Sequence, residues 1–230
     1  MNKRICIQGF EGSFHQMAAW EFFGKATGVI CCASFKDVVK LASDRKQSEG
    51  GIMAIENSIA GSILPNYSLL MKSNLRIVGE VYLQIKQNLL VNPGVTLTDI
   101  KEVHSHHMAI QQCFGFLDKY NWRLVETEDT ALSAKHIHQH RSKHIAAIAS
   151  KLAAELYQLD ILAPNIHIPI HLRDDAPATP ILTRRRSATS VMPGGPAVPV
   201  NPRIDETTYE DILRILEGMS LVIERSPKVF

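Results

Sequence analysis

The sequence predicts an α/β protein with two lobes and a ligand cleft between them. Two observations predict the fold: short apolar segments alternate with amphipathic ones, and this alternation falls into two successive units. A third observation predicts the cleft, because polar clusters follow several of the expected strands. The 230 residues, 45% of them hydrophobic and 21% charged, suffice for two small lobes of a globular protein.

The first unit has the order strand–helix–strand–helix–strand. Ser13 and Ser34 are placed to cap the two helices at their N-termini, and Gly24 ends the first helix. The βαβαβ order favours a parallel sheet covered by helices. The expected strands are residues 4–10, 28–34 and 50–57.

The second unit repeats this alternation after an extended segment, residues 76–92, that we expect to change direction near Gly79. Asp129 is placed to cap one of its helices. We therefore place the first lobe at residues 1–78 and the second at 79–159. The expected strands are 102–107, 122–127 and 144–150, and the expected helices are 107–121, 130–141 and 151–159.

Residues 167–230 differ in composition from the rest of the chain. The segment begins as an atypical linker rich in Pro and Arg, and its basic run at 182–187 is interpreted as a solvated patch. Helical spacing returns near the end, where Thr207 and Glu210 form a capping box, so a terminal helix is expected. Its apolar stripe comprises Ile212, Leu213, Ile215, Leu216 and Met219.

Charge and cysteine content exclude several classes of protein. A formal net charge of +2 argues against a nucleic-acid partner, and no segment is long and apolar enough for a membrane span. The cysteines form no CxxC pair and are interpreted as reduced, buried thiols, which favours a cytoplasmic protein. They are Cys6, Cys31, Cys32 and Cys113.

A cluster of three polar residues, Glu56, Asn57 and Ser58, lies where the third apolar strand ends, and Gly61 follows it. Taken alone, the cluster is equally well explained as a polar turn or as part of a binding site. Similar clusters follow other strands, at residues 8–15, 105–107 and 129–130. Their recurrence predicts a site for a polar, anionic small molecule, with helix N-termini supplying amides.

The histidines at positions 136, 140 and 144 raise the alternative of a metal site. Their spacing of four would suit a metal ion if all three lay on one helix. The segment from His144 onward reads as a strand, however, and no carboxylate is placed to support the ligands. We therefore expect no metal.

Five motifs in register resemble the prephenate dehydratase family over about residues 4–166. His107 stands where the family usually has Pro, and Gln158 where it has Gly. The matching residues are Gly9 to Phe14 with Ala18 and Ala19; Glu56, Asn57, Ser58 and Gly61; Ser105, His106, Gln112 and Cys113; Asp129, Thr130, Ala131 and Ala134; and Ala146 to Leu159.

The resemblance implies a fold like the type II periplasmic binding proteins, with the chain returning to the first lobe near residues 160–185. It also implies a lyase of phenylalanine biosynthesis that converts prephenate to phenylpyruvate, without a cofactor, and that forms a homo-oligomer. The substrate-binding residues that it implies are Glu56, Asn57, Ser58, Gly61, Ser105, His106 and Thr130.

The chain departs from the family pattern where a catalytic Thr-Arg-Phe motif is expected. That register holds Asp174, Asp175 and Ala176, and the nearest Thr-Arg pair, Thr183 and Arg184, comes about nine residues later. Thr183 is therefore the candidate catalytic residue. A regulatory ACT domain is not recognisable either, so no regulation by phenylalanine is expected. The alternative is a non-catalytic module that binds small carboxylates and has lost the motif.

Overall fold

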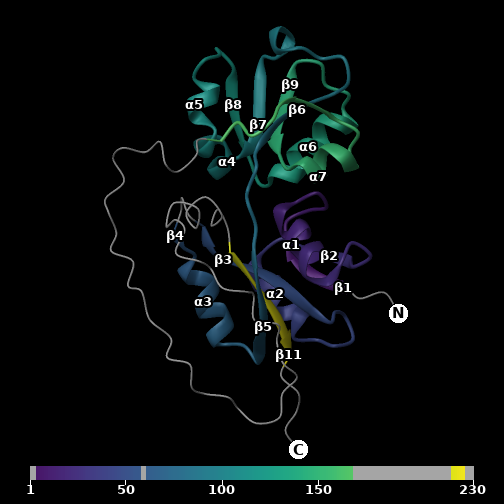
Figure 1. Cartoon of the computed structure of the whole chain (residues 1–230), viewed down its shortest axis with the longest axis vertical. Helices are drawn as coiled ribbons and strands as arrows, with labels where there is room; N and C mark the ends of the chain where they lie inside the picture. The colour runs from purple at the N-terminus through teal and green to yellow at the C-terminus, as the bar shows by residue number, and fades with distance from the viewer. Residues whose placement is uncertain (1–3, 58–60, 168–218, 226–230) are drawn as a thin grey trace, which may run out of the picture.

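The computed structural model describes residues 4–57, 61–167 and 219–225, and these form two lobes, each built around one β-sheet (Figure 1). The chain crosses from the first sheet to the second after Tyr82 and enters the second sheet at Asn88. The predicted α/β class with two sheets is confirmed. The predicted division at residue 78 falls inside the last strand before this crossing.

The first sheet has the strand order β2-β1-β3-β11-β5, with the short β4 paired to β3. Its first three strands are parallel, as the βαβαβ pattern predicted, whereas β11 is antiparallel to both of its neighbours. The strands are β1 (Arg4–Gln8), β2 (Gly28–Cys32), β3 (Gly50–Asn57), β4 (Gly61–Ser62), β5 (Leu75–Tyr82) and β11 (Met219–Arg225).

Helices cover both faces of this sheet. Helix α1 (Phe14–Phe23) begins at Ser13, whose hydroxyl accepts a hydrogen bond from the Gln16 amide, and packs Ala18 and Ala19 against one face. Helices α2 (Phe35–Ala42) and α3 (Leu64–Met71) pack on the other face. Side chains of successive strand residues alternate between the two faces, so each strand contributes to both cores.

The second sheet has the order β10-β6-β9-β7-β8. Strands β7, β8 and β9 are parallel, and β6 is antiparallel to both β9 and β10. Its strands are β6 (Asn88–Val91), β7 (Glu102–His106), β8 (Arg123–Thr127), β9 (Ile145–Ala149) and β10 (Asp160–Ala163). The helices of this lobe are η1 (Leu97–Asp99), α4 (His107–Gln112), α5 (Phe114–Leu117), α6 (Thr130–Gln139) and α7 (Lys151–Leu156).

A loop of the first lobe, residues 9–13, is docked onto the second lobe. The Ser150 hydroxyl donates to the Gly12 carbonyl over 2.6 Å, and the Tyr157 hydroxyl donates to the Glu11 carbonyl over 2.8 Å. Phe10 packs against the core formed by α6, α7 and β9. We call residues 9–13 the docking loop, because they tie the start of α1 to the opposite lobe.

The prediction of a terminal helix is wrong at the C-terminal end of that helix, where the structure has the strand β11. Met219 belongs to a strand instead of a helical stripe, and the rest of that expected helix lies outside the described residues. Val222 and Ile223 are both fully buried and pack in different cores, as successive residues of a central strand do. As a strand, the segment pairs its backbone with β3 on one side and with β5 on the other.

Three further expectations differ from the structure. The change of direction comes after Tyr82, since β5 continues through Gly79 with a bulge opposite β11. The helix expected at 107–121 is interrupted at Cys113, where α4 ends and α5 begins. Cys31, near the end of the edge strand β2, is exposed, whereas the neighbouring Cys32 is buried.

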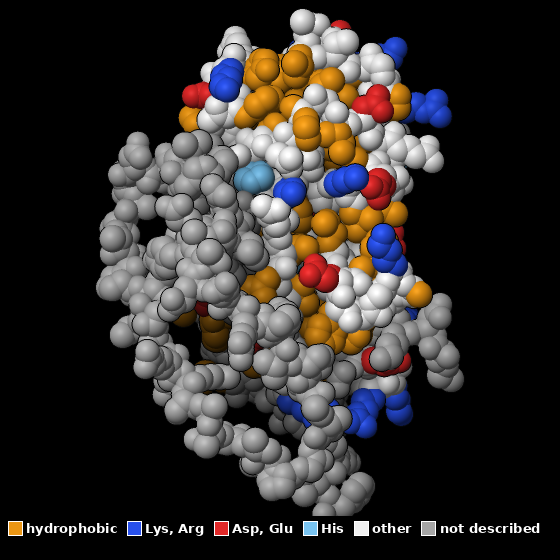
Figure 2. Space-filling model, in the orientation of Figure 1, with side chains coloured by type: hydrophobic (Ala, Val, Ile, Leu, Met, Phe, Trp, Pro, Cys, Tyr) orange, Lys and Arg blue, Asp and Glu red, His pale blue; other side chains and the backbone are white. Residues whose placement is uncertain are grey.

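The surface in Figure 2 shows hydrophobic side chains in both lobes, with acidic and basic side chains interspersed around them. No helix in the described part of the chain combines the length and the apolar character that a bilayer crossing requires.

Candidate functional site

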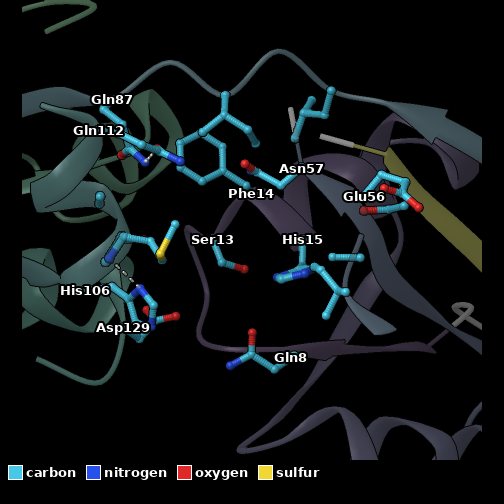
Figure 3. A pocket seen from close by; sticks show the side chains of 18 of the residues that line it. Gln8, Ser13, Phe14, His15, Glu56, Asn57, Gln87, His106, Gln112 and Asp129 are labelled. Atoms are coloured by element: carbon cyan, nitrogen blue, oxygen red, sulfur yellow. Dashed lines mark hydrogen bonds between the residues drawn. The ribbon is translucent and has the colours of Figure 1, made fainter. Parts of the chain in front are cut away.

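A cleft of about 240 Å³ lies where the two lobes meet (Figure 3). Strand ends and helix starts from both sheets supply its walls. The residues that line it are Gln8, Ser13, Phe14, His15, Ala54, Glu56, Asn57, Ile63, Leu83, Ile85, Gln87, His106, Met108, Ala109, Gln112, Glu128, Asp129, Thr130 and Ser220.

The end of β3 forms the acidic wall of the cleft. Glu56 and Asn57 are its last two residues, and in Figure 3 they lie across the cleft from His106 and Asp129. The Tyr67 hydroxyl, from α3, donates a hydrogen bond to the Glu56 carboxylate. Burial, together with this bond, raises the pKa of Tyr67 to about 12, so the phenol keeps its proton. Tyr67 therefore fixes the orientation of Glu56.

Two helix N-termini open onto the cleft from opposite lobes. Ser13 caps α1 and Asp129 caps α6, where the Asp129 carboxylate accepts from the Leu132 amide over 2.9 Å. The first amides of a helix have no partner within the helix, and the helix dipole makes this end favourable for anions. Phe14 and Thr130, the first residues of the two helices, both line the cleft. The caps occupy the Gln16 and Leu132 amides, so the amides of Phe14 and Thr130 are the ones left at these two helix starts for a ligand carboxylate.

Two histidines of the cleft are uncharged at neutral pH. Burial lowers the pKa of His15 to about 4, against a backbone hydrogen bond at Gln8 that raises it. Burial and the neighbouring His107 also lower the pKa of His106. The His106 Nδ1 accepts a hydrogen bond from the Met108 amide over 3.3 Å, so the ring proton is on Nε2. His106 can therefore donate a hydrogen bond to a ligand through Nε2–H.

A pair of glutamine side chains closes the cleft on the side of the second lobe. The Gln87 Nε2 donates to the Gln112 Oε1 over 3.4 Å, and both residues lie beside Phe14 in Figure 3. Gln87 comes from the segment that crosses between the lobes, and Gln112 is the last residue of α4. Both side chains are buried.

Four of the predicted substrate-binding residues are brought together in the cleft: Glu56, Asn57, His106 and Thr130. Ser105 is not among the lining residues. It is fully buried, on the face of β7 opposite to that of His106, and its hydroxyl donates to the Ile148 carbonyl over 2.7 Å.

Gly61 also lies outside the lining. It is in β4, an exposed strand of two residues, where it pairs with Asn57. Its φ of 76° is in the left-handed region, so glycine at this position allows the turn that follows β3. Ser58 and the candidate catalytic residue Thr183 lie outside the described residues.

Several lining residues were not predicted as site residues. The glycine turn at residues 8–15 indicated that Gln8 and His15 follow a strand, but nothing local distinguished their side chains as ligand-binding. Gln87 is in a segment that we interpreted as plain extended chain, and Ser220 is in one that we interpreted as the end of a helix. Only their tertiary neighbours place them in the cleft.

The described residues contain no group of three His, Cys, Asp or Glu side chains that could hold a metal ion. His136 is in α6 and His140 is its C-cap, whereas His144 lies beyond the helix with its Nδ1 2.9 Å from the Asp99 carbonyl oxygen. These three histidines therefore do not share one helix.

Residues 5–169 match the family model described as prephenate dehydratase. The chain is 37% identical over 166 residues to an arogenate dehydratase/prephenate dehydratase of Arabidopsis thaliana, covering 71% of this chain and 42% of that protein. It is 35% identical over 167 residues to a bifunctional chorismate mutase/prephenate dehydratase of Enterobacter agglomerans, covering 71% of this chain and 43% of that protein. The chain thus spans about two fifths of the length of these relatives.

Solved structures share the fold. A prephenate dehydratase from Arthrobacter aurescens in complex with L-Phe has a TM-score of 0.70 at 20% identity, covering 98% of this chain and 61% of that chain. GqqA, described as a novel type of quorum quenching acylase, has a TM-score of 0.70 at 24% identity, covering 99% of this chain and 66% of that chain. At these identities the likeness concerns the fold alone.

Proposed function

The chain belongs to the prephenate dehydratase family, and we propose that its cleft binds prephenate and converts it to phenylpyruvate in phenylalanine biosynthesis. The observation that carries this proposal is the meeting of Glu56, Asn57, His106 and Thr130 in one cleft. These residues lie at or just after the ends of strands in two different lobes. Polar groups that converge in one cleft are typical of a small-molecule binding site.

Two helix starts in the cleft suit the carboxylates of this substrate. Prephenate carries two carboxylates, and the starts of α1 and α6 offer backbone amides for them. Uncharged donors complete the lining, among them the hydroxyl of Thr130 and the Nε2 proton of His106.

The reaction needs the substrate to be held while one group leaves from each end of the ring. The bond between the ring and its carboxylate breaks, carbon dioxide leaves, and the released electron pair completes the aromatic ring as the carbon–oxygen bond of the ring hydroxyl breaks. The leaving hydroxide takes up a proton, so a donor near it lowers the barrier. His106 and Thr130 are donors in the described cleft, and Thr183 is the candidate that the family resemblance adds.

The compartment, the oligomeric state, the cofactor requirement and the regulation of this activity are also proposals. We expect a cytoplasmic protein, since none of the four cysteines is paired. We also expect a homo-oligomer, no cofactor and no regulation by phenylalanine. The names of some relatives include arogenate, which carries an amino group where prephenate carries a keto group, and this adds a second candidate substrate for the same cleft.

Incubation of the purified chain with prephenate, followed by chromatography for phenylpyruvate, tests the proposal. Two variants locate the chemistry: Glu56→Gln, which removes a charge from the acidic wall, and Thr183→Ala. We expect Glu56→Gln to lower kcat/KM by about tenfold or more, because a carboxylate accepts a stronger hydrogen bond from the substrate hydroxyl than an amide oxygen does. Glu155→Gln is the matched control, because Glu155 is exposed on α7 and pairs only loosely with Lys151 over 3.8 Å.

The outcomes separate the alternatives. Absence of turnover together with tight binding of prephenate, measured by calorimetry, would favour a non-catalytic carboxylate-binding module. Unchanged activity of Thr183→Ala would assign the proton donor to another residue, and His106 would be the next one to replace.

A further inference from the structure

The side chain of Gln87 has an unsatisfied acceptor in the wall of the cleft. Gln87 is 4% exposed, and its Oε1 has no hydrogen-bond partner among the described residues, while its Nε2 is engaged with Gln112. A buried carbonyl oxygen without a donor destabilises a protein by about 1–3 kcal/mol, so nearly all such groups are paired. Gln87 lines the cleft, so a ligand bound there is a source of the missing donor.

Its surroundings hold Gln87 in place for this role. The Gln87 carbonyl accepts from the Ile166 amide over 2.9 Å, which fixes the backbone of the crossing segment. The next side chain, Asn88, donates to the Ala149 carbonyl over 3.2 Å and accepts from the Asn165 amide over 3.2 Å. The acceptor is therefore preorganised, and a ligand does not have to order it on binding.

The charge of the described lining indicates which kind of donor fits. The charged side chains that line the cleft in the described part of the chain are acidic, namely Glu56, Glu128 and Asp129; Lys and Arg are absent from that set. Of two ligands whose carboxylates are held by the helix starts, the one that also carries an ammonium group gains additional attraction from these acidic side chains.

We propose that Gln87 is a specificity-determining residue whose Oε1 accepts a hydrogen bond from the protonated amino group of the substrate, so that the cleft prefers the aminated substrate, arogenate, to the keto acid. This inference rests on the proposed function, since it concerns the same cleft and the same reaction. An ammonium group brings three donors, whereas a keto oxygen brings none and would face the Gln87 oxygen acceptor to acceptor.

The test replaces Gln87 by methionine, which keeps the length of the side chain and removes the amide. We expect kcat/KM for arogenate to fall about ten- to hundredfold, the range for a hydrogen bond to a charged group. For prephenate we expect a fall of less than about threefold, because its keto group makes no such bond. Gln84→Met is the matched control: Gln84 is exposed on the same crossing segment and does not line the cleft, so neither rate should change.

Two kinetic results would overturn the proposal. An equal fall for both substrates would mean that Gln87 contacts a group common to both, such as the ring hydroxyl. No fall for either substrate would mean that the Gln87 oxygen has no ligand at all.

A binding measurement tests the role of Gln87 independently of turnover. Titration calorimetry with phenylalanine and with phenylpyruvate compares the two products, which differ in the same amino and keto groups. We expect the Gln87→Met variant to lose about ten- to hundredfold in affinity for phenylalanine and little for phenylpyruvate. If the protein turned over neither substrate, the proposed function would fail, yet this ratio would still support or reject the role of Gln87.

A second variant covers the case in which Gln87→Met does not fold. Gln87→Glu keeps the shape and replaces the amide by a charge; it loses the bond that Gln87 donates to Gln112 and keeps an acceptor oxygen for the ligand. Because the carboxylate attracts an ammonium group and repels a keto oxygen, this variant should raise the ratio of phenylalanine affinity to phenylpyruvate affinity above that of the unmodified protein. An unchanged or lower ratio would contradict the proposal.

Discussion

Asp129 combines a structural role and a site role in one side chain. It caps α6, lines the cleft, and lies so close to the docking loop that a Cβ on Gly9 would be 2.6 Å from its Oδ2. Burial raises its pKa above the ordinary value of 3.8, in spite of hydrogen bonds from the amides of Leu132 and Ala131 that lower it. The folded protein therefore holds the Asp129 proton more tightly than the unfolded chain does.

The first prediction concerns how the stability conferred by Asp129 depends on pH. A carboxyl group with a raised pKa in the folded state contributes stability that is fully present below its unfolded pKa, near 3.8. This contribution is lost as the pH rises through the folded pKa, because ionising the buried group then opposes folding. Asp129→Asn keeps a cap and does not titrate. We therefore compare the free energy of unfolding of the unmodified protein with that of this variant. The difference, unmodified minus variant, should fall as pH rises from about 4 to about 7.

Urea unfolding at several pH values measures this difference. Asp118→Asn is the control, since Asp118 is an exposed aspartate at the end of α5. Its difference from the unmodified protein should be flat over the same range. A difference for Asp129→Asn that is also flat would show that burial does not govern its ionisation.

Among the elements, the docking loop determines how α1 faces the second lobe. Gly12 has a φ of 89°, and a Cβ on it would lie 3.0 Å from the Cα of Ala153 in α7. Glycine is required here for two reasons, the backbone conformation and the close approach of another backbone. The position of Ser13 in the cleft therefore depends on a contact between lobes as well as on its own helix.

The second prediction separates those two reasons with a matched pair of substitutions. Gly24, at the end of α1, also has a φ of 89°, but a Cβ there would meet nothing within 4 Å. Gly24→Ala should lower the free energy of unfolding by about 1–2 kcal/mol, from backbone strain alone. Gly12→Ala should cost about 1–3 kcal/mol more, because the methyl group also presses on α7. Equal losses in chemical denaturation would mean that the loop is not tightly docked.

For the whole molecule, β11 joins the end of the described chain to the middle of the first sheet. It pairs with β3 on one side and with β5 on the other, and β5 has no other partner strand in the described sheet. Ser220 of this strand reaches the cleft. The integrity of the first lobe and of one cleft wall thus depends on residues near the C-terminal end of the sequence.

The third prediction tests this dependence with a buried charge. Val222 is fully buried beside Ile5 and Ile52, so Val222→Asp should destabilise the protein by about 4 kcal/mol or more. Hydrogen exchange should show loss of protection in β3 and β5. Ile77→Asp is the control, because Ile77 is 57% exposed on β5 and should tolerate the change to within about 1 kcal/mol. Retained protection in β5 of the Val222→Asp variant would contradict the pairing with β11.

The sequence by itself determined the α/β class, most helices and strands, and four of the cleft residues. These follow from local causes: caps such as Ser13 and Asp129 begin helices through bonds to amides three residues away, and polar residues after apolar strands gather at sheet edges. Only the tertiary structure decided that Ser105 is turned into the core and that β11 is a strand. It alone placed Gln87 opposite Gln112, because the face a strand residue takes and the partner it meets are fixed by segments far away in the chain.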